Sequence, residues 1–179
     1  MRETFDIEIA GVKRSLKRFA VSDSLDIAAF ILFGDVEITV AAATALLEKA
    51  PEFDYILTPE AKSIPLAYEM SRQSGKPYVV ARKGIKVYMG NPISVEVTSI
   101  TTQKVQTLYL GEDECAAIKG KRVLIVDDVI STGESLIAVQ KLVAEAGAVE
   151  AAACAVLAEG DAAKRDDIIF LNPLPLFFK

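Results

Sequence analysis

The sequence predicts an α/β fold built around a parallel sheet. Two segments, residues 53–75 and 123–147, share one order: an apolar run rich in β-branched residues, a polar turn, and an amphipathic stretch that ends at a glycine. This order is typical of a strand followed by a helix. Because strands that alternate with helices form parallel sheets, the repeated order predicts the fold class.

The first fifty residues are expected to form an N-terminal cap. We expect one helix to start near Ser22 or Asp23 and another to run from about Ile38 to Lys49. Together with the C-terminal segment FLNPLPLFFK, these residues would form a small hood over the sheet.

The core is expected within residues 50–175. Its predicted strands are Phe53–Thr58, Tyr78–Arg82, Val123–Val126, Ala151–Leu157 and Ile168–Leu171. Its predicted turns are Pro59–Ser63 and Asp127–Gly133, and its predicted helices are Ile64–Ser74 and a segment from Leu136 that Gly147 caps. Residues 84–110 interrupt the alternation and predict an antiparallel flap of two exposed strands, Ile93–Ile100 and Val105–Leu110, joined by Thr101–Lys104.

Composition removes several classes of chemistry. A chain of 179 residues, 51% of them hydrophobic and 25% charged, is expected to form a single globular domain, residues 1–179. It contains no histidine, which excludes histidine-dependent triads, a histidine general base, a histidine haem ligand and histidine-containing zinc sites. Two distant cysteines, Cys115 and Cys154, are too few for a four-cysteine metal site and favour a reduced, cytoplasmic protein.

Net charge and hydropathy limit the classes of binding partner that we expect. The net charge of −5 argues against a nucleic-acid-binding surface, while leaving room for a local basic pocket that takes a small anion. The N-terminus lacks the pattern of a secretion signal, and no apolar stretch approaches the roughly 18 to 20 residues that cross a bilayer. We therefore expect a soluble protein that binds small molecules and has no membrane partner.

The segment VLIVDDVISTG carries most of the functional information. A buried strand delivers Asp127 and Asp128 to its carboxyl end, which is where open α/β sheets bind ligands. The hydroxyl-rich residues 131–135 then open a helix, and backbone N–H groups at a helix N-terminus suit a phosphate dianion. Two adjacent aspartates alone would also fit an ordinary capped helix. Here the carboxylates can accept hydrogen bonds from sugar hydroxyls, and the turn that follows them can bind a phosphate. The segment therefore predicts a ribose 5-phosphate site.

This segment resembles the phosphoribosyl diphosphate (PRPP) binding motif of the type I phosphoribosyltransferases. The resemblance implies that Asp127 and Asp128 hold the ribose 2- and 3-hydroxyls. It also implies that the loop after them cradles the 5-phosphate, a role that falls on Ser131, Thr132, Gly133, Glu134 and Ser135. Adenine-type enzymes usually have glycine where this chain has Glu134.

The other strand-to-helix turn, TPEAKSI, resembles the diphosphate-binding loop of the same family. The resemblance assigns diphosphate binding to Glu60, Ala61 and Lys62, and places the basic cluster Arg82, Lys83 and Lys86 at the base of the flap, reaching toward the same group. Asp127, Asp128, Lys62 and Arg82 are the implied catalytic residues. The implied cofactor is Mg²⁺, held mostly by PRPP and water, with Asp128 as the candidate protein ligand.

The flap and base pocket differ from the adenine-type pattern. Thr102 and Gln103 stand where those enzymes have a tyrosine and a glutamate, and Glu96, the one flap carboxylate, is expected to face solvent. The run SITTQ is similar to the flap of xanthine-type enzymes and of the purine repressor of Gram-positive bacteria. A base pocket is expected between the flap, the turn after Ala151–Leu157 and the C-terminal segment. The aromatic residues Phe170, Phe177 and Phe178 would either stack on a purine there or pack in the core or a dimer contact.

The resemblance implies a purine phosphoribosyltransferase that acts as a homodimer. Its substrates would be PRPP and a purine base, with adenine as the first choice and xanthine or hypoxanthine as the second. The alternative is a regulator that senses PRPP without catalysis.

Overall fold

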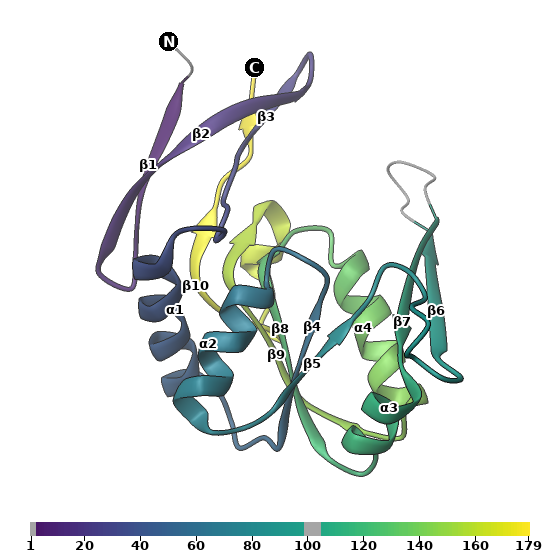
Figure 1. Ribbon diagram of the computed structural model, residues 1–179. Helices are drawn as coiled ribbons and strands as arrows, with labels where there is room; N and C mark the ends of the chain where they lie inside the picture. The colour runs from purple at the N-terminus through teal and green to yellow at the C-terminus, as the bar shows by residue number, and fades with distance from the viewer. Residues whose placement is uncertain (1–2, 99–104) are drawn as a thin grey trace.

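The computed structural model describes residues 3–98 and 105–179. Its central sheet has five strands in the order β10-β9-β8-β4-β5, and all neighbouring strands in it run parallel. The strands are β4 (Tyr55–Pro59), β5 (Tyr78–Ala81), β8 (Arg122–Ile130), β9 (Val149–Glu159) and β10 (Ile169–Leu174). The predicted parallel α/β fold is confirmed (Figure 1).

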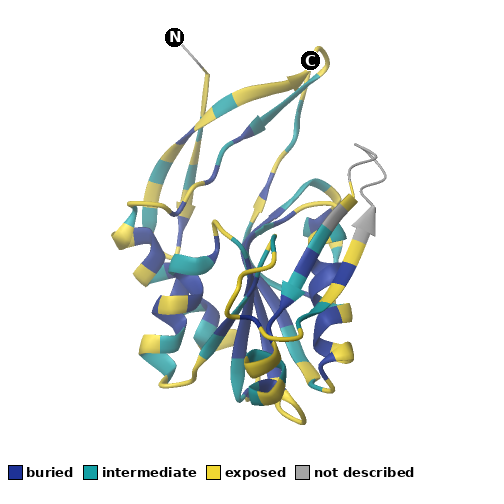
Figure 2. Cartoon of the chain, turned by 45° about the vertical axis from the view of Figure 1, so that its right-hand side comes forward, coloured by how far each residue is buried: buried dark blue, intermediate teal, exposed yellow. Residues whose placement is uncertain are grey.

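Helices cover both faces of this sheet. They are α1 (Val36–Lys49), α2 (Ile64–Ser74), α3 (Glu112–Ile118) and α4 (Glu134–Glu145). Alternate side chains of β8 point to opposite faces, so that Val123 and Ile125 join the core beneath α4, whereas Leu124 and Val126 join the core beneath α1 and α2. Figure 2 shows the central strands as a buried layer between helices whose outer sides are exposed.

The flap is an antiparallel pair, as predicted. Its strands are β6 (Ile93–Thr98) and β7 (Val105–Leu110). The expectation that both strands are exposed is wrong, because Val95, Leu108 and Leu110 are buried in the same core as α4. A bridge between Arg82 and Tyr109 joins the flap to the end of β5.

The hood is a second, antiparallel sheet built from both ends of the chain (Figure 1). Its strands are β1 (Thr4–Ile9), β2 (Val12–Ser22), β3 (Leu25–Ala28) and β11 (Phe177–Phe178). The helix predicted near Ser22 is wrong, since β2 ends there and a short turn leads into β3. Ser24 N–H bonds to the Ser22 hydroxyl at 3.3 Å, which shows why small polar residues that can start a helix also form turns.

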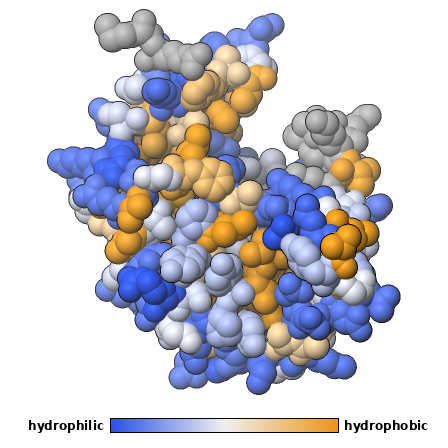
Figure 3. All heavy atoms as spheres, viewed as in Figure 1, coloured by the Kyte–Doolittle hydropathy of each residue, from blue (hydrophilic) through white to orange (hydrophobic). Residues whose placement is uncertain are grey.

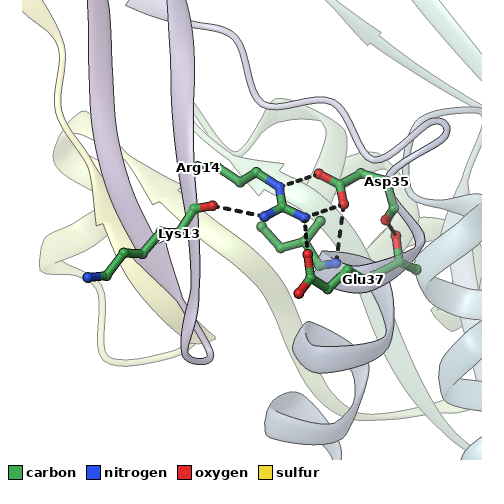
Figure 4. A network of polar contacts seen from close by, with 6 residues as sticks. Lys13, Arg14, Asp35 and Glu37 are labelled. Atoms are coloured by element: carbon green, nitrogen blue, oxygen red, sulfur yellow. Dashed lines mark hydrogen bonds and ion pairs between the residues drawn. The ribbon is translucent and has the colours of Figure 1, made fainter.

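One polar network fastens the hood to α1 (Figure 4). Arg14 on β2 donates from Nε and Nη2 to the two oxygens of Asp35 at 2.7 and 2.8 Å, and from Nη2 to Glu37 at 2.8 Å. Asp35 is also the N-cap of α1, where it accepts from the N–H of Ile38. The position of the hood is therefore coupled to the start of a core helix.

The outer surface mixes apolar and charged side chains. Figure 3 shows apolar residues at separate places among charged ones, and the exposed set includes Val36 on α1, Tyr68 on α2 and Val87 before the flap. Among the described residues, the helices are all too short or too polar to cross a bilayer.

Candidate functional site

The predicted diphosphate loop and the aspartate pair meet at the carboxyl ends of β4 and β8. A cavity of about 250 Å³ lies there, between the turn after β4, the end of β8 and the flap. It is lined by Pro59, Glu60, Ala61, Lys62, Ser63, Lys83, Leu108, Asp127, Asp128, Val129 and Ser135. The structure thus brings the predicted diphosphate loop and the aspartate pair to one pocket, although more than sixty residues separate them in the chain.

The two aspartates are part of a strand rather than of a turn. The turn predicted at Asp127–Gly133 is wrong in its first half, because β8 continues to Ile130 and pairs with β9 as far as Ala158. Asp128 is 3% exposed, and its N–H donates to a carboxylate oxygen of Asp127 at 2.8 Å. Burial and the adjacent Asp128 raise the pKa of Asp127. The charged form of the aspartate pair would be stabilised by hydroxyl groups that donate hydrogen bonds to it or by a nearby cation.

Lys62 supplies one such cation. Its ammonium nitrogen lies 2.8 Å from Oδ2 of Asp128, while more than half of its side chain stays exposed. Lys62 therefore lies over the rim of the pocket and offsets the buried carboxylate.

The turn after β4 is tied to the basic segment that follows β5. The peptide bond between Glu60 and Ala61 is cis. Glu60 accepts from the N–H of Lys83 at 2.9 Å, and its carboxylate lies 3.6 Å from Nε of Arg82. Beneath this turn, buried Ser63 accepts from Thr58 at 2.7 Å.

The three basic residues predicted after β5 separate in the structure. Lys83 lines the cavity, Arg82 is half-buried beside Glu60, and exposed Lys86 lies outside the lining residues. Of the three, Lys83 is the residue placed to meet a ligand directly.

The predicted phosphate loop forms a second, smaller hollow of about 40 Å³, which Ser131, Thr132, Gly133, Glu134 and Ser135 help to line. Gly133 is the N-cap of α4, with a φ of 83° that favours glycine, and no side chain among the described residues caps the helix there. The N-terminus of α4 therefore borders this hollow, and backbone N–H groups at a helix N-terminus suit an anion.

A third cavity, of about 580 Å³, joins this loop to the hood. Ser131 and Thr132 line both hollows. The larger one is completed by Leu25 and Ile27 of the hood, by Leu176, and by Glu159, Asp161, Ala162 and Arg165 around the short 3-10 helix η1 (Gly160–Lys164). This arrangement suits a flat, partly apolar group attached to a ribose phosphate.

A family model for the phosphoribosyl transferase domain matches residues 36–173. The chain belongs to the phosphoribosyltransferase family. The match covers the central sheet, its helices and the flap, while the first three hood strands lie before it.

Two curated relatives of this phosphoribosyltransferase differ in what their names state. The hypoxanthine/guanine phosphoribosyltransferase of Methanothrix thermoacetophila is 40% identical over 114 residues, which are 64% of this chain and 56% of that protein. The purine biosynthesis transcriptional repressor PurR of Bacillus subtilis is 33% identical over 85 residues, which are 48% of this chain and 29% of the repressor. The chain thus spans little more than half the length of the enzyme and less than a third of the repressor.

A solved structure shows the same fold. The adenine phosphoribosyltransferase of Trypanosoma brucei, in complex with AMP, pyrophosphate and ribose-5-phosphate, superposes with a TM-score of 0.70. The match covers 96% of this chain and 76% of that one at 18% identity.

The remaining predicted residues of this phosphoribosyltransferase lie elsewhere. Phe177 packs edge-on against Phe5 at 5.4 Å, Phe178 is exposed, and Phe170 packs against the core beneath α4, so these aromatic residues do not line the hood cavity. Glu96 faces solvent as expected. Thr102 and Gln103 lie outside the described residues.

Sequence reasoning missed Glu159, Arg165 and the hood residues Leu25 and Ile27. Glu159 is half-buried at the end of β9, and burial raises its pKa, an effect that the charge of Lys62 opposes. The position of Glu159 directly after a buried apolar strand was a usable signal, since side chains there face the ligand edge of a parallel sheet. No local pattern identifies Leu25 and Ile27, because their place depends on how the hood folds back.

Proposed function

We propose that this chain is a purine phosphoribosyltransferase that transfers the 5-phosphoribosyl group of PRPP to a ring nitrogen of a purine. The observation that supports this most is the placement of Asp127 and Asp128 between two anion sites. On one side lies the uncapped N-terminus of α4, and on the other lie Lys62 and Lys83. Ribose 5-phosphate with a diphosphate at its anomeric carbon has the matching order of groups.

In the proposed reaction, the purine nitrogen forms a bond to the anomeric carbon as the bond from that carbon to the diphosphate oxygen breaks. The nitrogen loses its proton to water, and the diphosphate leaves with the electron pair. Asp127 and Asp128 orient the ribose through its hydroxyls, while Lys62 and Lys83 stabilise charge that develops on the leaving group. Neither role needs a histidine.

Mg²⁺ fits as a cofactor that enters with the substrate. Asp128 and Glu60 offer the hard oxygen ligands that Mg²⁺ prefers. In this proposal Mg²⁺ is bound mainly through PRPP oxygens and water, with these carboxylates as the available protein ligands. When bound, Mg²⁺ would offset the negative charge of the diphosphate.

The acceptor base is proposed to be a purine that carries a 6-oxo group. The name of the Methanothrix relative favours hypoxanthine or guanine over adenine, which was the first choice from the sequence. The hood cavity supports a purine of either kind, since Leu25, Ile27 and Leu176 offer apolar contact and Glu159 and Asp161 offer polar contact. The homodimer and the cytoplasmic location remain predictions.

A PRPP-sensing regulator is the second candidate. The similarity to the purine repressor favours it, and such a protein would bind PRPP without turnover. The two functions are separated by measuring diphosphate release from PRPP and Mg²⁺ with hypoxanthine, guanine, xanthine, adenine, uracil and orotate, alongside calorimetric titration with PRPP. Release with a purine supports the enzyme. Binding of PRPP with no release for any base supports the regulator, and absence of PRPP binding contradicts both.

A further inference from the structure

Arg165 reaches from the end of η1 to the phosphate loop. The carboxylate of Asp167 accepts from its Nε at 2.8 Å and from its Nη2 at 2.7 Å, which fixes the plane of the guanidinium group. The third nitrogen, Nη1, faces Gly133 so closely that a Cβ at that position would lie 2.7 Å from it. One edge of the guanidinium group is thus engaged by Asp167, and the other is presented to the loop.

The charges around the loop explain what this cation would do. Glu134 lies in the first turn of α4, and Asp127 lies just before the loop. Glu159 and Asp161 line the adjoining hood cavity, where Arg165 is the one cation among the described lining residues. A phosphate dianion at the start of α4 would therefore meet several carboxylates, and the helix dipole contributes only about half a positive charge.

We propose that Arg165 binds the 5-phosphate of PRPP and of the nucleotide product, with Nη1 as the donor. This inference rests on the proposed function and adds a residue to it. A hydrogen bond from a guanidinium to a phosphate oxygen is charge-assisted, and Arg165 is oriented for it before the ligand arrives. The role differs from that of Lys62 and Lys83, which lie at the cavity on the other side of the aspartate pair.

The test compares ribose 5-phosphate with inorganic diphosphate as titrants of the full chain. Arg165→Ala is expected to weaken binding of ribose 5-phosphate by about 10- to 100-fold, which is typical for the loss of a hydrogen bond between charged groups. Affinity for diphosphate is expected to stay unchanged. The effect should be larger above pH 6 than below it, since the second pKa of a phosphate monoester is about 6 and the dianion gains most from the arginine.

Two further variants keep the test decisive. Lys164→Ala removes the neighbouring cation, which is exposed and paired with Asp161, and it should bind ribose 5-phosphate like the wild type. Asp167→Asn keeps the charge of Arg165 but weakens the contact that orients it, so a smaller loss in the same direction is expected even if Arg165→Ala folds poorly.

Several outcomes would overturn the inference. Unchanged affinity for ribose 5-phosphate in Arg165→Ala, or an equal loss for ribose 5-phosphate and diphosphate, would show that Arg165 only supports the fold around the loop. If the wild type bound neither PRPP nor ribose 5-phosphate, the proposed function would fail together with the inference. Wild-type binding that Arg165→Ala leaves intact would reject the inference alone.

Discussion

Lys62 Nζ lies 2.8 Å from Oδ2 of Asp128, so the diphosphate loop and the ribose-binding strand are joined by an ion pair. The carboxylate is buried, whereas the lysine side chain is more than half exposed. A ligand that brings a diphosphate and two hydroxyls would approach both partners at once. The pair therefore links the two halves of the proposed PRPP site.

Lys62→Ala is predicted to weaken PRPP and diphosphate binding while leaving ribose 5-phosphate binding nearly unchanged. The expected loss is about 1.5 to 3 kcal/mol at low ionic strength, typical of contacts between charged groups, and smaller at high salt because the lysine is exposed. Calorimetric titration at two salt concentrations checks this. Lys121→Ala, which removes an exposed lysine outside the cavity, serves as the control. Equal losses for all three ligands would place Lys62 in a structural role.

The aspartate pair predicts an unusual dependence of stability on pH. The folded-state pKa of Asp127 is raised to about 8, so the folded chain keeps a proton that the unfolded chain releases near pH 4. Stability contributed by this group falls as pH rises between those two values, and the full penalty is present above the folded-state pKa.

Asp127→Asn removes that penalty. The variant should match the wild type in free energy of unfolding below about pH 4 and exceed it by a margin that grows as pH rises to 9, while PRPP binding is weakened. Urea unfolding at pH 4, 7 and 9 measures the difference, with Asp161→Asn as a control at an exposed carboxylate. A difference that does not grow with pH would contradict the burial of charge at Asp127.

The sequence predicted the core of the fold better than its hood. α2 begins and ends at the predicted residues, because Pro65 fits the first turn and Gly75 adopts the left-handed conformation that ends the helix. The sequence did not predict β2. This strand carries several charged residues and therefore lacks the apolar run that indicates a buried strand. The hood sheet is completed by β11 from the other end of the chain, which pairs with β3, and no local pattern reports that pairing.

The candidate site shows the same division. The motif Val123–Gly133 identified the aspartates and the loop after them, since all of these groups are close in sequence. Arg165 could not be found in that way, because its relation to Gly133 depends on the path of η1 after β9. The flap strands were expected to be exposed. This expectation was wrong, because alternate residues such as Val95 pack in the same core as α4.

The contact between the hood and α1 predicts a loss of stability in Asp35→Ala. This change removes both the N-cap of α1 and the acceptor for Arg14, and loss of an N-cap alone typically costs about 0.5 to 2 kcal/mol. Asp35→Asn keeps a capping oxygen and should lose less stability than Asp35→Ala.

The same pair predicts a dependence of stability on pH. Arg14 lowers the pKa of Asp35, so the stability that this pair contributes is present above the unfolded-state pKa and is lost as pH falls through the folded-state value. Urea unfolding of both variants at pH 3 and pH 7 checks the order and the pH dependence, and equal stability of Asp35→Ala and the wild type at pH 7 would contradict it.

The flap predicts which side chains support turnover if the chain is a transferase. Glu96 faces solvent, so Glu96→Gln should have nearly wild-type turnover and PRPP affinity. Gln103, which only the sequence resemblance assigns to the flap, should matter more, and Gln103→Ala is expected to lower kcat while PRPP affinity stays largely intact. Steady-state kinetics with the preferred purine, together with PRPP titration, measure both variants. General acid or base catalysis is typically worth about 10² to 10⁴-fold, so a loss of that size in Glu96→Gln would contradict the solvent-facing position of Glu96 and the flap register assigned here.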